Sequence, residues 1–344
     1  MAAVAFRDGE YLPYTDIGVG IGTHALHYGT SVFEGLRGYW SAERSELYLF
    51  RAQDHFARLL GSARFYGMTL PGSVADLCTI AREILRRSGV RQDVYVRPIQ
   101  FICSEGIGLW RADLRESFVM FHAPMGKYIG DGGIRCCVST WRRPHGSTAP
   151  TRAKIGGVYA SLALARREAM QAGFDEAITL TVDGRVAEGS AENIFLVIDG
   201  KLVTPSLGSD ILAGITRAAV IELAEKELGL LTVERDVNPS ELAFAEEVFF
   251  SGTAAEVTPV VEIDRRAVGD GVPGPVTLRL AAIYDDVVHG LREEYASWLL
   301  PVYAADGAAP ADHATDAAAT DGAAPADHAT PAATPAATPA EESR

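Results

Sequence analysis

Two Asp-Gly pairs, each set between stretches of alternating apolar residues, constrain the fold of this chain more than any other feature. They occur in AITLTVDGRVAEG (177–189) and in NIFLVIDGKLVTP (193–205). Aspartate and glycine tolerate the positive φ angles of the two-residue turns that join neighbouring antiparallel strands. Both stretches therefore predict β-hairpins. No GxGxxG or GxxxxGK[ST] motif follows a strand pattern, so the sequence does not indicate a Rossmann or P-loop domain.

Helix patterns alternate with strand patterns along most of the chain. Residues 46–68 pass from an alternating strand into a helix whose apolar side chains recur every three to four positions. Residues 74–89 and 216–229 have the pattern of amphipathic helices, each ending at a glycine. Residues 93–103 alternate as a strand, and Pro98 within them indicates an edge strand or a bulge. This order predicts the α+β class with largely antiparallel sheets.

Composition divides the chain into four parts. We expect a small α+β domain at 1–124, an interdomain linker at 125–135 around the glycine-rich PMGKYIGDGG, and a large α+β domain at 136–303. Residues 304–344 are rich in Ala, Pro, Thr, Asp and Gly, and they repeat DGAAPADHAT. Such a segment has little apolar surface to offset its chain entropy, so we expect a disordered low-complexity tail.

Charge and composition exclude several classes of function. The formal net charge of −14 disfavours binding to nucleic acid or to an anionic membrane. No apolar run reaches the roughly 18 residues of a membrane-spanning helix, and the N-terminus lacks the apolar core of a signal peptide. The four cysteines have no CxxC spacing, which predicts reduced thiols in a cytoplasmic protein. The repeat duplication explains the tail histidines, so we expect no metal site.

The stretch TRAKIGGVYA (151–160) places Lys154 directly before two glycines. Glycines beside a lysine leave room for a planar ring that bulkier neighbours would block. Lysine is also the residue that forms Schiff bases with carbonyl cofactors. The alternative is a loop in which Lys154 is simply solvated.

Further segments carry groups that such a cofactor needs. Glu188 ends a hairpin strand, where its carboxylate could keep a pyridinium nitrogen protonated. Ile215 and Thr216 open a helix whose free N–H groups can bind an anion, and residues 251–254 form a second small-residue turn. Arg58 could add a bidentate phosphate contact. Taken singly, these residues also fit a solvated turn glutamate, an ordinary helix cap and a solvated arginine.

Seven motifs in this order resemble the fold-type IV, class IV aminotransferases, which depend on pyridoxal 5′-phosphate, and most closely the branched-chain amino acid aminotransferases. The resemblance runs from about residue 23 to residue 298. The motifs are HYGTSVFEGLRGY (27–39), RLLGSA (58–63), YVRP (95–98), AKIGGVY (153–159), EGSAEN (188–193), GITR (214–217) and SGTAAEVTPV (251–260). The resemblance implies a two-domain fold and a role in amino-acid biosynthesis.

The resemblance also implies roles for the cofactor site. Lys154 would form the Schiff base and carry the proton, Glu188 would contact the pyridine nitrogen, and Tyr159 would contact the ring 3′-oxygen. The residues that would hold the cofactor phosphate are Arg58, Ile215, Thr216 and Thr253. The implied reaction is ping-pong transamination between a branched-chain, or related hydrophobic, L-amino acid and 2-oxoglutarate.

For the substrate, the resemblance implies a pocket that two subunits share. Thr253 and Ala254 would offer backbone amides to the α-carboxylate, and Arg97 would meet the distal carboxylate of glutamate. The residues that would line the remaining walls are Phe33, Tyr95, Met125 and Tyr128. Tyr28 would reach into the neighbouring site of a homodimer.

One departure from the family pattern leaves the identity of the substrate more open than the type of reaction. Met125 stands where many bacterial members carry a tryptophan, and a flexible thioether loosens that wall of the pocket. Two enzymes of the same fold stay open as alternatives, an aminodeoxychorismate lyase and a D-amino acid aminotransferase. A cofactor-binding protein without catalytic activity is the third alternative.

Overall fold

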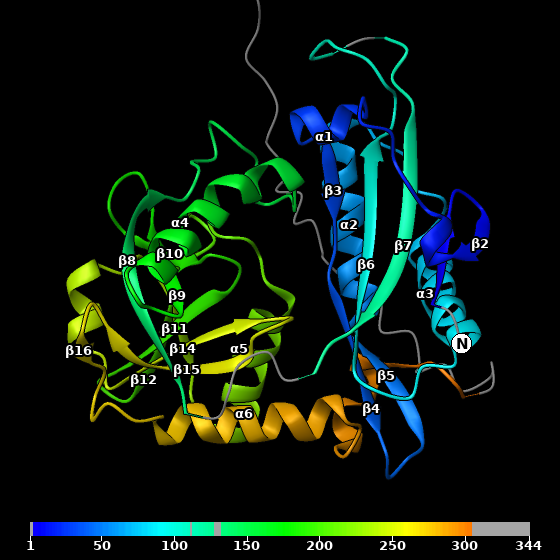
Figure 1. The fold of residues 1–344 in the computed structure, drawn as a ribbon. Coiled ribbons are helices and arrows are strands. Elements are labelled where there is room, and N and C mark those ends of the chain that lie inside the picture. The colour runs from blue at the N-terminus through cyan, green and yellow to red at the C-terminus, as the bar shows by residue number, and fades with distance from the viewer. Residues whose placement is uncertain (1–2, 111, 127–131, 305–344) are drawn as a thin grey trace, which may run out of the picture. The chain divides into compact units, whose positions relative to one another are not determined.

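The first of two β-sheets in the structure is antiparallel throughout (Figure 1). The computed structural model describes residues 3–110, 112–126 and 132–304. In these residues the sheet has the order β17-β5-β4-β6-β7-β1-β2, and β3 pairs with β6. Its strands are β1 (Val4–Arg7), β2 (Glu10–Pro13), β3 (Ser31–Phe33), β4 (Leu36–Ser41), β5 (Glu46–Phe50), β6 (Val94–Ile102), β7 (Glu116–Pro124) and β17 (Leu299–Pro301). Strand β17, the last in the described residues, thus returns to pair with β5.

Three helices accompany this sheet: α1 (His24–Tyr28), α2 (Ala52–Tyr66) and α3 (Val74–Ser88). Ser73 and Asp76 form a capping box at the start of α3, which satisfies backbone N–H groups that the helix leaves free. Gly89 ends α3 in the left-handed conformation, as its pattern predicted. The apolar faces of α2 and α3 pack into the core over the sheet, through residues such as Phe56 and Leu77.

The second sheet mixes parallel and antiparallel pairs. Its order in the described residues is β10-β9-β8-β15-β14-β11-β12-β13, and β16 pairs with β15. The strands are β8 (Ile134–Arg142), β9 (Glu176–Leu180), β10 (Val186–Gly189), β11 (Asn193–Ile198), β12 (Lys201–Thr204), β13 (Thr232–Glu234), β14 (Glu247–Gly252), β15 (Glu256–Ile263) and β16 (Arg266–Ala267). Three pairs are parallel, β8 with β9, β8 with β15, and β12 with β13.

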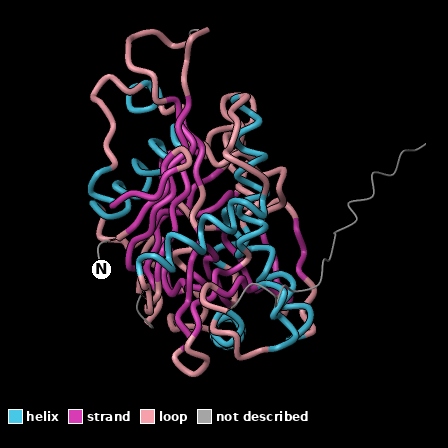
Figure 2. Tube along the Cα trace, turned by 90° about the vertical axis from the view of Figure 1, so that its right-hand side faces the viewer, coloured by secondary structure: helices cyan, strands magenta, loops and turns pink. Residues whose placement is uncertain are grey.

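Helices α4 (Tyr159–Gln171), α5 (Ile215–Leu228) and α6 (Pro275–Val288) pack against the second sheet. Figure 2 shows helices flanking the strands. Short 3₁₀ helices complete the chain at η1 (Tyr14–Asp16), η2 (Gly156–Val158), η3 (Pro239–Ala243) and η4 (Glu293–Trp298). Helix α5 ends at Gly229 as predicted, and Val220 and Leu223 are buried in the core that it shares with α6.

The two Asp-Gly hairpins have different turns. Strands β11 and β12 are joined by Asp199 and Gly200 alone, with φ angles of 51° and 66°, as the sequence predicted. Strands β9 and β10 also pair antiparallel, but residues 181–185 connect them, so the prediction of a two-residue turn there is wrong. The turn is closed by the Thr181 N–H, which donates to the Arg185 carbonyl at 2.8 Å, and by the Gly184 N–H, which donates to the Thr181 carbonyl at 3.0 Å. The register of β10 then shifts between Val186 and Gly189.

Pro98 lies inside the sheet, so the prediction of an edge strand or bulge is wrong. Strand β6 pairs with β7 along its whole length, and on its other side with β4 at residues 94–96 and with β3 at residues 99–101. Pro98 falls where β3 has ended and β4 has not yet begun. Its carbonyl accepts the Glu34 amide at 2.9 Å. In an antiparallel strand a residue's N–H and C=O point the same way, so the missing N–H of Pro98 faces this gap and breaks no ladder bond.

The α+β class is confirmed, and both sheets belong to one compact unit. The predicted boundaries at residues 124, 135 and 303 stay predictions. Residues 305–344, which hold nearly all of the predicted tail, lie outside the described part of the chain. In the described ranges, no helix is long and apolar enough to cross a membrane.

Candidate active site

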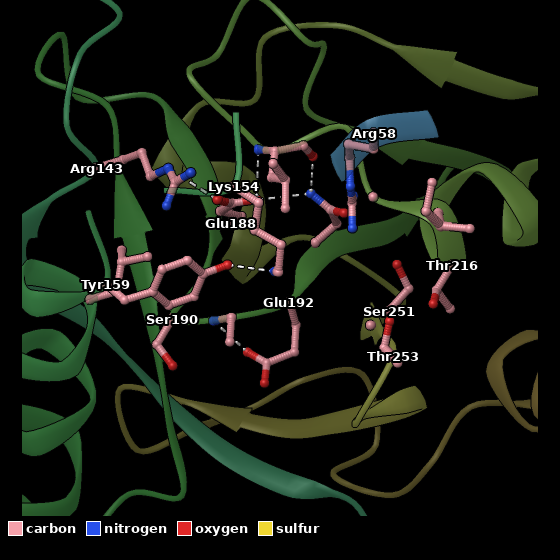
Figure 3. A pocket seen from close by; sticks show the side chains of 17 residues that line it. Arg58, Arg143, Lys154, Tyr159, Glu188, Ser190, Glu192, Thr216, Ser251 and Thr253 are labelled. Atoms are coloured by element: carbon pink, nitrogen blue, oxygen red, sulfur yellow. Dashed lines mark hydrogen bonds and ion pairs between the residues drawn. The ribbon is translucent and has the colours of Figure 1, made fainter. Parts of the chain in front are cut away.

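The backbone of Lys154 is held by two hydrogen bonds, while its side chain extends into the cleft. Its N–H donates to Ser62 Oγ on α2 at 3.0 Å, and its carbonyl accepts the Phe33 N–H at 3.1 Å. The Nζ donates to Tyr159 Oη at 2.6 Å, the contact drawn in Figure 3. The short helix η2 leads directly into α4, whose first residue is Tyr159. This local path of the chain brings the Tyr159 ring opposite the lysine.

The two glycines after Lys154 make room for the protein itself. A Cβ on Gly156 would lie 2.2 Å from Ser31 Oγ, and a Cβ on Gly29 would lie 2.6 Å from the Cα of Gly157. The Gly157 N–H donates to the Gly29 carbonyl at 3.1 Å. The glycines thus let the lysine segment lie close to the first sheet. Gly156 also lines the larger cavity described below, so the room for a planar ring stays a prediction.

Glu188 is buried among three groups that hold its carboxylate in place. Oε1 lies 3.0 Å from Arg143 Nε, and Oε2 accepts from Asn193 Nδ2 at 2.9 Å and from the Leu212 N–H at 3.2 Å. Burial raises the pKa of Glu188 above its ordinary 4.5, while the charge of Arg143 acts in the opposite direction. Sequence reasoning missed Arg143, since an arginine in WRRP carries no local signal of such a partner.

Groups suited to an anion gather at the start of α5. Helix α5 begins at Ile215 without a side-chain cap, so its first N–H groups are available. Thr216 and Thr253 line the same cleft as Arg58, which approaches from α2 (Figure 3). The Ser251 hydroxyl also lines it, and this buried hydroxyl has no hydrogen-bond partner among the described residues. Sequence reasoning had noted the turn that contains Ser251 without assigning it a role.

A larger cavity of about 600 Å³ adjoins this cleft and shares Lys154, Tyr159 and Thr253 with it. Arg97 donates to Tyr95 Oη at 3.0 Å, and its guanidinium lies 4.7 Å from the ring centre of Phe33. The Nε of Arg97 is buried and has no hydrogen-bond partner in the described part of the chain. The other predicted residues that line this cavity are Met125 and Ala254.

Two predicted substrate residues are not brought together with the rest. Tyr28 lies on α1, and its hydroxyl accepts the Gly108 N–H at 3.1 Å. It lines neither the cleft nor the larger cavity. Tyr128 lies outside the described residues.

Glu192 lines both hollows, although sequence reasoning gave it no role. Its side chain is buried, and Oε2 accepts the Ala191 N–H at 3.0 Å. Burial, and next the charge of Glu176, raise the pKa of Glu192 to about 8. Glu188 acts in the same direction, and Arg166 opposes the shift. Glu192 therefore tends to stay protonated at neutral pH.

Replacing Glu192 with glutamine should flatten the pH dependence of stability. The folded state binds the Glu192 proton more tightly than the unfolded chain does. The free energy of unfolding therefore falls as pH rises from about 4.5 towards about 8. We expect Glu192→Gln to remove this decrease in the free energy of unfolding, which is on the order of a few kcal/mol over that pH range. Urea unfolding at several pH values measures this, with the exposed Glu225→Gln as control. Parallel curves for Glu192→Gln and wild type would contradict the assignment.

The described residues contain no group of three His, Cys, Asp or Glu side chains placed to hold a metal ion.

The amino-transferase class IV family model matches residues 31–263, and the chain belongs to this family. It is 45% identical over 300 residues to a probable branched-chain-amino-acid aminotransferase of Aquifex aeolicus, covering 87% of this chain and 96% of that protein. The branched-chain aminotransferase of Thermoproteus uzoniensis, solved with norvaline, matches at 41% identity and a TM-score of 0.84, covering 88% and 100%. The enzyme of Thermobaculum terrenum, solved in its PLP form, matches at 35% identity and a TM-score of 0.84, covering 88% and 98%.

Proposed function

We propose that this chain is a pyridoxal 5′-phosphate-dependent aminotransferase that moves an amino group between a branched-chain, or related hydrophobic, L-amino acid and 2-oxoglutarate. One observation carries the proposal: Lys154, Glu188 and the start of α5 converge on one cleft. That cleft adjoins a cavity in which apolar walls surround Arg97. The names of the relatives support the choice of substrate.

The donor set of the cleft fits this cofactor. A phosphate dianion needs N–H and O–H donors and a cation. The start of α5, the Ser251 hydroxyl and Arg58 supply them. A pyridine nitrogen that must stay protonated needs a carboxylate, which Glu188 supplies. An aldehyde needs an amine, which Lys154 supplies.

Each residue then has a definite task. When bound, the cofactor supplies an aldehyde that condenses with amines and a ring that accepts the electron pair of a breaking bond. Lys154 Nζ, which lies 2.6 Å from Tyr159 Oη, would take the proton from the substrate's α-carbon and would deliver it to the carbon that the cofactor's aldehyde supplies. Glu188 keeps a proton on the ring nitrogen, and Arg143 holds that carboxylate in position. The backbone amides of Thr253 and Ala254 orient the α-carboxylate.

A panel of amino donors against two acceptors tests the proposal. We expect leucine, isoleucine and valine to bleach an absorbance band at roughly 410–430 nm, and 2-oxoglutarate to restore it. Release of pyruvate without an acceptor would identify a lyase, and turnover of D-amino acids alone would identify the D-specific enzyme. Absence of the band, or a band that no amino acid bleaches, would remove the aminotransferase proposal.

Replacing Arg97 should slow the half-reaction with glutamate more than the half-reaction with leucine. The Arg97 guanidinium stacks on Phe33 and bonds to Tyr95 Oη. These two contacts stabilise its charge when an apolar substrate side chain fills the cavity. A distal carboxylate would accept from Arg97 Nε, for which the described part of the chain offers no acceptor. We expect Arg97→Leu to weaken the glutamate half-reaction by about 2–5 kcal/mol, and the leucine half-reaction much less.

Single-turnover absorbance changes with each donor measure this difference. Arg135→Leu, on a side chain that pairs with Asp175 at the surface, serves as the control for loss of an arginine. Equal losses for glutamate and leucine would show that Arg97 does not discriminate between them.

We further propose that the chain works as a homodimer. Large apolar side chains are exposed around α1 and in the segment that follows β6, with Ile107 at 92% and Ile21 at 84% exposed. The others are Leu26, Leu109 and Trp110. Tyr28 contacts the backbone of the same segment, which supports a role for this face at a neighbouring site. Sedimentation at micromolar concentration tests this, and a monomer would contradict it.

The cytoplasm is the proposed location, and the four free cysteines support it. Cell fractionation tests this, and recovery from an oxidising compartment would contradict it.

A further inference from the structure

Glu34 is a buried carboxylate to which the reaction above assigns no task. Its side chain is 0% exposed. Oε1 accepts from Arg58 Nε at 2.6 Å, and Oε2 accepts from Arg58 Nη2 at 2.9 Å. Oε2 also lies 2.8 Å from His55 Nδ1. The arginine and the carboxylate thus meet in a two-pronged pair away from bulk water.

The backbone explains why a glutamate can be buried at this point. Glu34 lies in the break between β3 and β4, opposite Pro98, where neither strand pairs with β6. Its amide bonds to the Pro98 carbonyl at 2.9 Å, so the chain stays attached to the sheet across the break. The helix that faces this break is α2, and His55 and Arg58 lie three positions apart on it, on one face.

Arg58 is held from a second direction as well. Its Nη1 donates to the Ala213 carbonyl at 2.6 Å, directly before Gly214 and the start of α5. Glu34 and Ala213 together fix the plane of the guanidinium, so its orientation beside the first N–H groups of α5 is set in advance. Without Glu34, two of these three bonds are lost and a largely buried cation loses its counter-charge.

The same elements hold Lys154. The residue before Glu34, Phe33, donates its N–H to the Lys154 carbonyl, and Ser62, one turn beyond Arg58 on α2, accepts the Lys154 N–H. Arg58 and Lys154 are therefore attached to one short frame formed by the end of β3 and α2. A cofactor that is held by its phosphate at one end and by an amine at the other depends on the distance between these two residues.

We propose that Glu34 is the positioning residue of the phosphate site: it orients Arg58 towards the start of α5 and so fixes the phosphate end of the cofactor relative to Lys154. This inference rests on the proposed function. It predicts that Glu34 affects binding of the phosphate group and not binding of the pyridine ring.

The test compares two ligands that differ only in the phosphate. The full chain, freed of cofactor by dialysis, is titrated with pyridoxal 5′-phosphate and with pyridoxal. We expect Glu34→Gln to weaken pyridoxal 5′-phosphate at least about tenfold and pyridoxal less than about twofold. In an Arg58→Ala background the same substitution should change neither affinity, because its effect passes through Arg58.

Glu46→Gln is the matched control. Glu46 is also a buried carboxylate, but it accepts the amides of Leu47, Val302, Tyr303 and Ala304, and it lines neither hollow. We expect it to lower the melting temperature without changing the preference for the phosphorylated ligand. A purely structural role for Glu34 would give the same result as this control.

A second variant covers the case in which Glu34→Gln fails to fold. Arg58→Lys keeps a cation at the phosphate, but the ammonium group cannot reproduce the planar bonds to both Glu34 oxygens and to Ala213. We expect its preference for pyridoxal 5′-phosphate over pyridoxal to fall at least about tenfold as well. Unchanged preference in either variant overturns the inference and leaves the proposed function standing. A wild-type chain that binds neither ligand overturns the proposed function itself.

Discussion

Replacing Lys154 with alanine is expected to lower the rate of amino-group transfer by several orders of magnitude while the chain keeps its fold. The substitution removes the amine that would attach the cofactor and the group that would carry the substrate's proton. The fold should survive because the backbone bonds of residue 154, to Ser62 and to Phe33, do not involve the side chain. Single-turnover absorbance and steady-state rates with leucine and 2-oxoglutarate measure the loss.

The control for this variant is Lys201→Ala, at the exposed start of β12. Both variants should melt within a few degrees of wild type, since neither side chain contributes to the core. Near-normal turnover by Lys154→Ala would remove the lysine from the reaction. Unfolding of Lys154→Ala alone would show that the side chain has a structural role that its contacts do not reveal.

The parts of the fold that could be predicted from the sequence depend on neighbours along the chain. The ends of α3 and α5 follow from Gly89 and Gly229, which adopt the left-handed conformation. The turn at Asp199 follows from the residue types at two adjacent positions. The prediction at Asp183 failed because the bonds of Thr181 with Gly184 and Arg185 close a longer local turn. The prediction at Pro98 failed because a distant segment, the gap between β3 and β4, faces its missing N–H.

The candidate site divides in the same way. Lys154, Tyr159, Glu188, Thr216 and Thr253 were predicted because each lies in a motif of the family, and the structure brings them to one cleft. Their predicted roles remain proposals. Four further residues of the site were given no role from the sequence: Glu34, Arg143, Glu192 and Ser251. Glu34, Glu192 and Ser251 lie inside the family motifs, but the motif does not show what each side chain contacts. Arg143 lies outside the motifs, and its partner Glu188 is far along the chain.

Replacing Glu188 with glutamine should leave cofactor binding in place and lower the rate about 10²- to 10⁴-fold. A neutral amide cannot favour a protonated ring nitrogen as a carboxylate does. The substitution also removes the counter-charge of Arg143, which lies 3.0 Å away and is itself buried. Within the described residues Arg143 then keeps its bond to the Asp210 carbonyl and has no counter-charge, so its charge disfavours a proton on the ring nitrogen.

Loss of stability must be separated from loss of chemistry in that variant. Glu247→Gln provides the comparison, because Glu247 is a buried carboxylate that accepts the Val276 and Thr277 amides at the start of α6, away from the cleft. Both variants should lower the midpoint of urea unfolding, since each disturbs a buried charge. Only Glu188→Gln should lower the rate per folded molecule with cofactor bound. A wild-type rate in Glu188→Gln would mean that the ring nitrogen does not depend on this carboxylate, and an equal loss in Glu247→Gln would assign the effect to folding.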